Sequence, residues 1–233
     1  MNPGVKTPVI SIALLGTEST GKTQLAVAMA QALSARGHRV AVVAEWLREW
    51  CTLEGRTPRP DEQAAIAQTQ AQRVIEAGAR LAAEPAALPA CVIADTTPLM
   101  TAIYSDWLFA DASLYPMALA HQRGFTHTLV TGLDLPWVAD GLQRDGPQVR
   151  APIDSLLRRQ LADGGLPFKV IYGSGEERLN NALQAIGMAA ATARAPSPAS
   201  RASARWVWAC DKCSDPECEH RLFSRLSAKS PPA

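Results

Sequence analysis

The sequence lacks a marked excess of charge of either sign. It has 23 Lys and Arg residues against 22 Asp and Glu residues, a formal net charge of +1 at pH 7. Proteins that bind nucleic acid through a basic surface carry a clear positive excess. We therefore expect no nucleic-acid partner.

Long apolar runs are also absent. A membrane-spanning helix needs about 20 consecutive apolar residues, and no segment of the sequence approaches that length. The first residues, MNPGVKTPVI, lack the apolar core of a signal peptide and lead into a predicted strand. We expect a cytoplasmic protein with no membrane partner.

Cysteine is sparse over most of the chain. Of the five cysteines, Cys51 and Cys91 stand apart in the first half, and the other three crowd together near the end. A disulfide-stapled secreted domain spreads its cysteines more evenly, and a reducing cytosol does not favour such pairs. This distribution excludes a disulfide scaffold.

What the sequence does contain is a regular alternation of apolar and helical segments. Strands are predicted over residues 8–15, 39–44, 90–95, 126–132 and 167–172. Helices are predicted over residues 21–36, 60–84, 151–163 and 175–190, with more helical sequence up to about residue 123. The strands are apolar nearly throughout, as in parallel strands covered on both faces. The pattern predicts an α/β fold, a five-stranded parallel sheet flanked by helices.

The composition changes after residue 190, which we take as the end of the main domain, residues 1–190. ATARAPSPASRASAR, residues 191–205, is rich in small residues, Pro and Ser, and it is typical of a flexible linker. Residues 206–223 form a short cysteine-rich segment, too small to bury a core. Residues 224–233 are expected to be a disordered tail.

The segment GTESTGKT follows the first predicted strand and leads into a helical segment. It matches G-x-x-x-x-G-K-[ST], in which backbone N–H groups and a helix N-terminus surround phosphate oxygens. Lys22 is expected to reach the β- and γ-phosphates of ATP, and the Thr23 hydroxyl to bind Mg²⁺. The motif predicts a P-loop NTPase fold with ATP bound by Gly16, Thr17, Glu18, Ser19, Thr20, Gly21, Lys22 and Thr23.

Two carboxylates stand where predicted strands end, at the edge of the sheet at which ligands bind in open α/β folds. Glu45 follows strand 39–44, and Asp95 ends strand 90–95. Each is suited to hold Mg²⁺ or to accept a proton from an acceptor hydroxyl, and each is also a common helix cap. The sequence leaves the catalytic base open between them. We expect Glu45 to be the base and Asp95 the metal-side acid.

Two aromatic pairs have helical spacing. Trp46 and Trp50 are four residues apart, with Arg48 between them, and Tyr104 and Trp107 are three apart. One interpretation of each pair is core packing. The other is a substrate site, in which the rings stack on a flat heterocycle, particularly a cationic one.

These segments, together with DLPWVADGLQRDG at residues 134–146, resemble the ribosylnicotinamide kinase domain of NadR-type proteins, within a wider group of small AAA-labelled P-loop proteins. The resemblance spans about residues 8–190. It implies transfer of phosphate from ATP to the 5′-hydroxyl of nicotinamide riboside, which gives nicotinamide mononucleotide. The nucleotidyltransferase and helix-turn-helix domains of NadR-type proteins do not fit before a phosphate loop at residue 16, so we expect neither adenylyl transfer nor repressor activity.

The resemblance also assigns residues. It implies that Trp137 and Asp140 lie near the substrate and a lid, that Arg144 stabilises the transferring phosphoryl group, and that Arg150 adds a second positive charge. A solvated loop cation is the alternative for Arg144. After the last strand, YGSGEERL occupies the usual place for holding adenine, with three candidate residues: Gly173, Ser174 and Arg178.

The cysteine-rich segment contains CDKCSDPECEH, with the spacing C-x₂-C-x₄-C-x-H. A C-x-x-C turn points two thiolates at one tetrahedral ion. We therefore expect a zinc knuckle formed by Cys210, Cys213, Cys218 and His220; the alternatives are free thiols or a redox pair.

The sequence thus predicts an ATP- and Mg²⁺-dependent kinase of a small nucleoside, most simply nicotinamide riboside. One alternative is a kinase for another flat heterocyclic substrate. The other is a regulatory ATP-binding or ATPase module whose zinc tail docks a protein partner.

Overall fold

The structure is a computed structural model, and it describes residues 7–138 and 146–189. Five strands form one sheet in the order β2-β3-β1-β4-β5, and every neighbouring pair is parallel. The strands are β1 (Val9–Leu15), β2 (Val40–Val43), β3 (Ala90–Asp95), β4 (His127–Thr131) and β5 (Lys169–Ile171). The predicted parallel α/β sheet is confirmed.

The helices and short 3₁₀ turns lie between and after the strands. They are α1 (Lys22–Ser34), α2 (Trp46–Glu54), η1 (Pro60–Glu62), α3 (Gln63–Ala83), α4 (Pro98–Phe109), α5 (Tyr115–Gln122), η2 (Pro147–Val149), α6 (Arg150–Asp163) and α7 (Gly175–Ala185). Among the described residues, no helix is long and apolar enough to cross a membrane.

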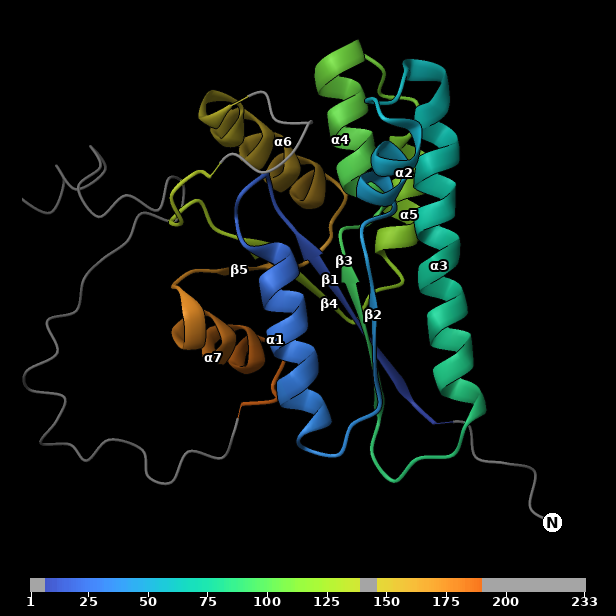
Figure 1. The fold of residues 1–233 in the computed structure, drawn as a ribbon, viewed down its shortest axis with the longest axis vertical. Coiled ribbons are helices and arrows are strands. Elements are labelled where there is room, and N and C mark those ends of the chain that lie inside the picture. Colours follow the sequence, from blue (N-terminus) through green and yellow to red (C-terminus); the bar gives the residue numbers. More distant parts are fainter. Residues whose placement is uncertain (1–6, 139–145, 190–233) are drawn as a thin grey trace, which may run out of the picture. The chain divides into compact units, whose positions relative to one another are not determined.

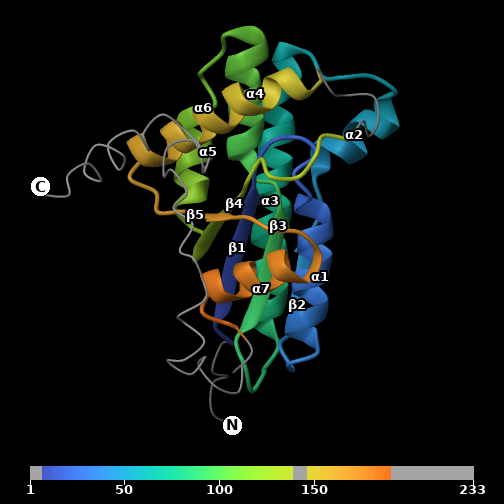
Figure 2. The same cartoon turned by 90° about the vertical axis from the view of Figure 1, so that its left-hand side faces the viewer.

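Helices cover both faces of the sheet (Figures 1 and 2). One apolar cluster joins α1 and α7 to the sheet through side chains such as Leu14, Met29 and Leu183. On the opposite face, α4, α5 and α6 pack on alternate strand residues, including Leu15 and Val130, and α3 packs beside β2 and β3. Strand residues are therefore buried on both sides, which explains why the strands read as continuous apolar runs.

The strand register brings chemically important segments together. Leu14 of β1 pairs with Asp95 of β3, and Val43 of β2 pairs with Ala94. Because all strands are parallel, the segments that follow them emerge at the same edge of the sheet. The phosphate loop after β1, Asp95 at the end of β3 and Glu45 after β2 therefore lie at neighbouring strand ends.

The predicted boundaries need small adjustments. Strand 39–44 ends at Val43, so Glu45 stands at the N-cap of a separate helix, α2, which ends at Gly55 in the left-handed conformation. The helical sequence up to residue 123 is two helices, separated at Ala110, a residue with φ 54°. Cys51 and Cys91 are both buried, and they form no disulfide with each other.

Candidate functional site

The phosphate loop runs from the end of β1 to the first turn of α1. Gly16 has φ +145°, and a Cβ on it would lie 2.1 Å from the Thr131 hydroxyl, so no other residue fits there. Gly21 has φ +75°, in the left-handed region that favours glycine, and it precedes Lys22, the first residue of α1. The backbone thus turns into the helix N-terminus as a phosphate cradle requires.

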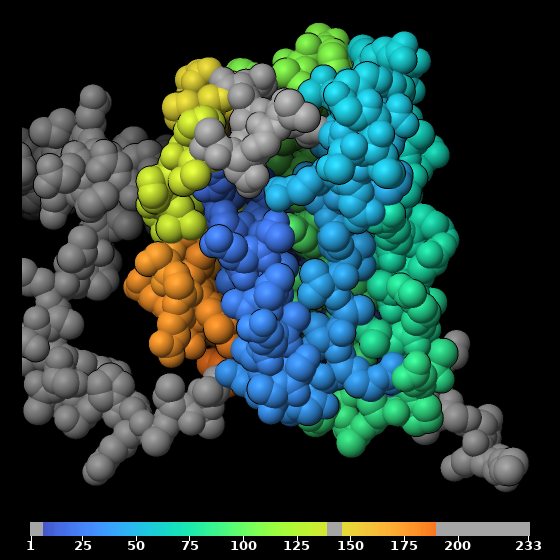
Figure 3. All heavy atoms as spheres, viewed as in Figure 1, coloured from blue at the N-terminus to red at the C-terminus, as the bar shows by residue number. Residues whose placement is uncertain are grey.

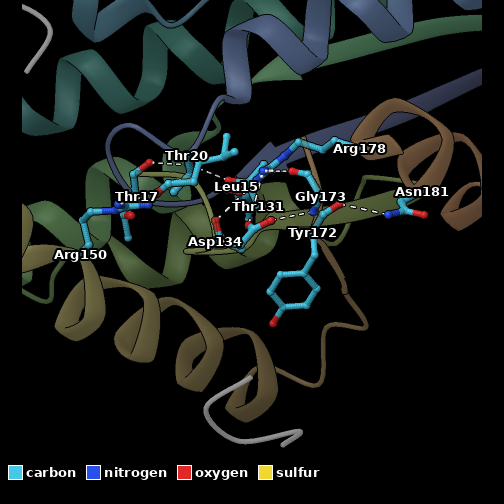
Figure 4. Close-up of polar contacts among 12 residues, drawn as sticks. Leu15, Thr17, Thr20, Thr131, Asp134, Arg150, Tyr172, Gly173, Arg178 and Asn181 are labelled. Carbon is cyan, nitrogen blue, oxygen red and sulfur yellow. Dashed lines mark hydrogen bonds and ion pairs between the residues drawn. The ribbon is translucent and has the colours of Figure 1, made fainter. Parts of the chain in front are cut away.

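Hydroxyl groups hold the loop in shape from inside. The buried Thr20 hydroxyl donates to the Thr17 carbonyl at 2.8 Å. The hydroxyl of Thr131, at the end of β4, lies 2.7 Å from the Thr20 hydroxyl and 3.1 Å from the Leu15 carbonyl (Figure 4). The Lys22 ammonium donates to the Thr17 carbonyl at 2.7 Å, across the loop. The loop is therefore preorganised by its own contacts.

Thr23 and Asp95 meet beside this loop. The Thr23 hydroxyl donates to Asp95 Oδ2 at 2.6 Å, which joins the start of α1 to the end of β3. Asp95 is 3% exposed, and its Oδ1 has no hydrogen-bond partner among the described residues. A buried carboxylate oxygen without a partner is costly, and it points to a ligand that the site is built to receive.

The next residue, Thr96, is strained. Its φ is 80°, a conformation that β-branched residues rarely adopt. The backbone nevertheless holds it there through two bonds: the Thr96 N–H donates to the Leu14 carbonyl at 3.1 Å, and its carbonyl accepts from Gln70 Nε2 at 3.2 Å. Such strain persists only where the surroundings over-determine the backbone, and it is common at functional sites.

Glu45 differs from Asp95 in its surroundings. It is the N-cap residue of α2, but its side chain makes no capping hydrogen bond. Instead its Oε2 lies 3.5 Å from Nη2 of Arg48, one turn along α2, and the Glu45 side chain is 21% exposed. The structure therefore offers a carboxylate that solvent or a substrate can reach.

A cleft of about 570 Å³ opens at the phosphate loop. It lies where the start of α1, α2 and the segment after β4 approach one another, and Figure 3 shows the face of the molecule on which α1 and α2 lie, in two shades of blue. Its described lining residues are Ser19, Thr20, Gly21, Lys22, Thr23, Gln24, Arg48, Leu135, Pro136 and Val138. Two cations and a helix N-terminus face this cleft, so it favours an anion.

Arg150 is buried although it carries a charge. Its Nη1 donates to the Leu135 carbonyl at 3.0 Å, while Nε and Nη2 have no partner among the described residues. Burial lowers its pKa, and the charges of Asp134 and Asp154 raise it. Two unpaired donors on a buried guanidinium are consistent with the predicted second positive charge.

The residues predicted to hold adenine form a network between the ends of β4 and β5 (Figure 4). Arg178 is 3% exposed; its Nη1 donates to the Gly173 carbonyl at 2.7 Å and lies 3.4 Å from Asp134 Oδ1. The Gly173 N–H donates to Asp134 Oδ2 at 2.6 Å. Ser174 caps α7 by position, without a side-chain hydrogen bond. The Arg178 guanidinium thus holds the segment after β5 in shape through Gly173 and Asp134. A direct contact of Arg178 with adenine stays a prediction.

The predicted tryptophan pair on α2 already contacts cations of the protein. The Arg73 guanidinium carbon lies 4.1 Å from the centroid of the Trp46 ring, and that of Arg56 lies 4.9 Å from the Trp50 ring centroid. One face of each ring is therefore occupied. Stacking of these rings on a substrate stays a prediction.

The two residues of the second aromatic pair, Tyr104 and Trp107, differ in how far they are buried. Tyr104 packs against the core cluster of α4, α5 and α6, whereas Trp107 is 45% exposed. Trp137 lies between two residues that line the cleft, and its indole nitrogen is buried without a partner among the described residues. Substrate contacts by these three side chains also remain predictions.

Several predicted residues lie outside the described part of the chain. They are Asp140, Arg144, Cys210, Cys213, Cys218 and His220. Within the described ranges, no group of three or more His, Cys, Asp and Glu side chains is arranged to hold a metal. The zinc site and the lid arginine stay predictions.

The structure adds residues that the sequence analysis did not place in the site. Arg48 lines the cleft beside the phosphate loop, and Asp134 joins the β4 and β5 ends. The sequence showed Arg48 only as a cation between two tryptophans, although its spacing of three from Glu45 was a usable signal. Asp134 follows predicted strand 126–132, much as Glu45 follows strand 39–44, so its position after a strand was a usable signal.

Comparison with known proteins identifies the family. The model of a family described as "AAA domain" matches residues 11–178. Among solved structures, NadR in complex with NR is similar at 20% identity and a TM-score of 0.61, covering 77% of this chain and 52% of that chain. NadR in complex with NAD and AMP-PNP is similar at 17% identity and a TM-score of 0.58, covering 80% and 52%. This chain spans about half the length of these NadR chains.

A thymidylate kinase from Ehrlichia chaffeensis is also similar, at 14% identity and a TM-score of 0.55, with coverage of 77% of this chain and 98% of that chain. No curated protein sequence matches. The structural likenesses show the fold, and the family match spans well over half of the chain. The chain therefore belongs to the AAA domain family, and it has the P-loop fold shared by nucleoside and nucleotide kinases.

Proposed function

We propose that the protein is an ATP-dependent kinase that phosphorylates the 5′-hydroxyl of nicotinamide riboside. The observation that carries the ATP-dependent part of this proposal is the contact between Thr23 and the buried Asp95, directly beside Lys22 in the phosphate loop. A buried acid with an unpaired oxygen beside the loop suits the Mg²⁺ that accompanies a nucleoside triphosphate, because the charge on the phosphates must be balanced by a metal. This arrangement supports an enzyme that uses ATP, and the choice of a kinase over an ATPase rests on the resemblance to the ribosylnicotinamide kinase domain.

The residues present fit Mg²⁺. This ion prefers oxygen ligands, and it is usually held by one or two protein side chains together with phosphates and water. Thr23 Oγ1 and Asp95 supply such oxygens, and Asp95 Oδ1 has its coordination capacity unused. When bound, Mg²⁺ would neutralise charge on the β- and γ-phosphates. Thr23 would hold it directly, and Asp95 directly or through water.

The chain's other charged groups complete the site. Lys22 would exchange its contact with the Thr17 carbonyl for a contact with the β- and γ-phosphates. Glu45 accepts the proton of the acceptor hydroxyl, since it is the acid that a substrate can reach. Arg48 supplies positive charge from the opposite wall of the cleft, and its contact with Glu45 keeps the two side chains together.

The acceptor is inferred from the resemblance of the sequence to a known kinase domain and from the likeness of the fold to solved structures. The sequence segments of the site resemble the ribosylnicotinamide kinase domain, and a NadR structure with NR has the same fold. The aromatic side chains of α2 suit a flat cationic ring. The thymidylate kinase likeness, in which nearly the whole of that chain is covered, supports a second candidate: a kinase of another nucleoside or nucleotide.

A panel assay separates these candidates. Purified protein with ATP and Mg²⁺ would be given nicotinamide riboside, thymidine, uridine, adenosine and thymidylate in turn, and kcat/KM measured by ADP release. We expect nicotinamide riboside to give the highest kcat/KM. A higher value for any other acceptor would overturn the substrate assignment and leave the kinase intact. ADP release at one rate, whatever the acceptor, would instead identify an ATPase.

A further inference from the structure

Gln70 is a buried polar residue on the mainly apolar buried face of α3, a face that also carries Gln63. It lies in α3 among Ile66, Ala67 and Val74, and only 2% of it is exposed. Burying an amide among apolar side chains is costly unless both of its ends are hydrogen-bonded. Its partners therefore explain its presence.

Both partners are backbone groups of the two segments that carry the candidate acids. Gln70 Oε1 accepts from the N–H of Trp46, the residue after Glu45, at 2.7 Å. Gln70 Nε2 donates to the carbonyl of Thr96, the residue after Asp95, at 3.2 Å. A single side chain thus bridges the end of β2 and the end of β3.

The chemistry of this bridge requires an amide. A backbone N–H needs an acceptor and a backbone carbonyl needs a donor, so the orientation of the Gln70 amide is fixed by its partners. A carboxylate would only accept, and an ammonium would only donate. The Thr96 carbonyl belongs to the strained residue with φ 80°, so this bond also helps to hold that conformation.

Resting on the proposed phosphotransfer function, we propose that Gln70 is a positioning residue that sets Glu45 and Asp95 at the spacing that catalysis needs. Gln70 itself touches neither carboxylate. It acts through Trp46 and Thr96, each one residue from an acid. A displacement of reacting groups by about 1 Å can cost roughly 100-fold in rate, so a lost bridge should be visible in turnover.

The chain supplies a matched control. Gln122 of α5 is 1% exposed; it accepts from the Thr97 hydroxyl at 2.7 Å and donates to the Thr128 hydroxyl at 2.9 Å. It is an equally buried amide with the same number of bonds. Its partners are side-chain hydroxyls, whereas the Trp46 N–H and the Thr96 carbonyl are bonded by Gln70.

The experiment compares Gln70→Met with Gln122→Met, since methionine keeps the length of the side chain and removes both hydrogen bonds. Tm, kcat, the KM for ATP and the Mg²⁺ concentration for half-maximal rate would be measured well below both melting temperatures. We expect both variants to lose similar thermal stability. Only Gln70→Met should lose kcat, by roughly 10- to 100-fold, and need more Mg²⁺, with little change in the KM for ATP. Equal kcat in the two variants would overturn the inference.

Two further measurements keep the outcome decisive. If Gln70→Met does not fold, Gln70→Asn takes its place, because an amide one methylene shorter cannot reach both partners together, and it should show the same loss of kcat. If the wild-type protein transfers phosphate to no acceptor and releases no ADP, the proposed function has failed. Gln70 is then tested by the binding of a non-hydrolysable ATP analogue. Gln70→Met should weaken only the Mg²⁺-dependent part of that binding, and the same weakening in Gln122→Met would overturn the inference.

Discussion

The two acids at the site occupy neighbouring strand ends with very different surroundings. Asp95 ends β3, which lies between β1 and β2, and it is buried, with one oxygen bonded to Thr23. Glu45 follows the edge strand β2, is partly exposed and faces Arg48. An interior strand produces a fixed, dry carboxylate, and an edge strand produces one that a substrate can reach. The position of each strand in the sheet thus gives the two acids different surroundings, and the proposed roles of metal-side acid for Asp95 and proton acceptor for Glu45 rest on that difference.

The largest expected effect comes from removing the positive charge of Lys22, in the phosphate loop. Lys22→Ala should lower kcat/KM by at least about 100-fold, because the phosphates lose the cation that faces them. The fold should survive, because Lys22 lies outside the apolar clusters that join the helices to the sheet. Steady-state kinetics and a melting curve would test this. Near-normal turnover at an unchanged Tm would remove Lys22 from the mechanism.

Asp95→Asn tests the proposed metal-binding role of the buried acid. The amide can still accept from the Thr23 hydroxyl, but it lacks the charge that favours Mg²⁺. We expect the Mg²⁺ concentration for half-maximal rate to rise by about 10-fold or more, with a lower kcat. A Mg²⁺ titration at saturating ATP measures both. An unchanged Mg²⁺ requirement would exclude Asp95 from the metal site.

Glu45→Gln tests the proposed role of the partly exposed acid as proton acceptor. General-base catalysis by a positioned side chain typically contributes about 100-fold to 10,000-fold, and its loss changes the pH dependence of turnover. We expect kcat to fall and its acid limb to flatten, while the Mg²⁺ requirement stays close to that of the wild type. A pH profile of kcat is the measurement. If Glu45→Gln altered the Mg²⁺ requirement and Asp95→Asn the pH profile, the two roles would be reversed.

Arg178, between the loops after β4 and β5, tests whether a residue distant from the two acids affects nucleotide binding and leaves turnover unchanged. Arg178→Gln removes a buried charge paired with Asp134 and bonded to the Gly173 carbonyl. We expect a loss of about 2 kcal/mol in the free energy of unfolding and a raised KM for ATP with little change in kcat. Denaturant titration and steady-state kinetics would show it. A fall in kcat without a change in the KM for ATP would contradict a role in shaping the nucleotide loop.

The smallest effect is a pH dependence of stability that does not involve the site. Burial lowers the pKa of His121, on α5. His121 therefore binds a proton more readily in the unfolded chain than in the folded one. Its contribution to the free energy of unfolding is fully present above about pH 6.5 and is lost as pH falls below that value. The loss should be about 1 kcal/mol or less between pH 7.5 and 5.5 and smaller in His121→Gln. An equal loss in that variant would assign the effect to other groups.

The sequence predicted the architecture because its signals are local. The phosphate loop, the apolar strands and the acid at residue 95 are readable over short windows, and the five parallel strands are found where expected. The bridge through Gln70 and the pair of Asp134 with Arg178 were not predictable, because they join residues far apart in sequence. A hint existed for Gln70: a polar residue at a core position of a regular apolar stripe needs partners. A hint existed for Asp134 as well, because it follows predicted strand 126–132, but that position does not identify Arg178 as its partner.

The central claim is that phosphate passes from ATP to a hydroxyl of nicotinamide riboside. Phosphorus NMR of a reaction containing protein, ATP, Mg²⁺ and nicotinamide riboside tests it most directly, with Lys22→Ala as the control. The account predicts ADP and one new phosphomonoester in equal amounts, with no signal growth in the control. Equal amounts of ADP and inorganic phosphate, with the riboside unchanged, would contradict it.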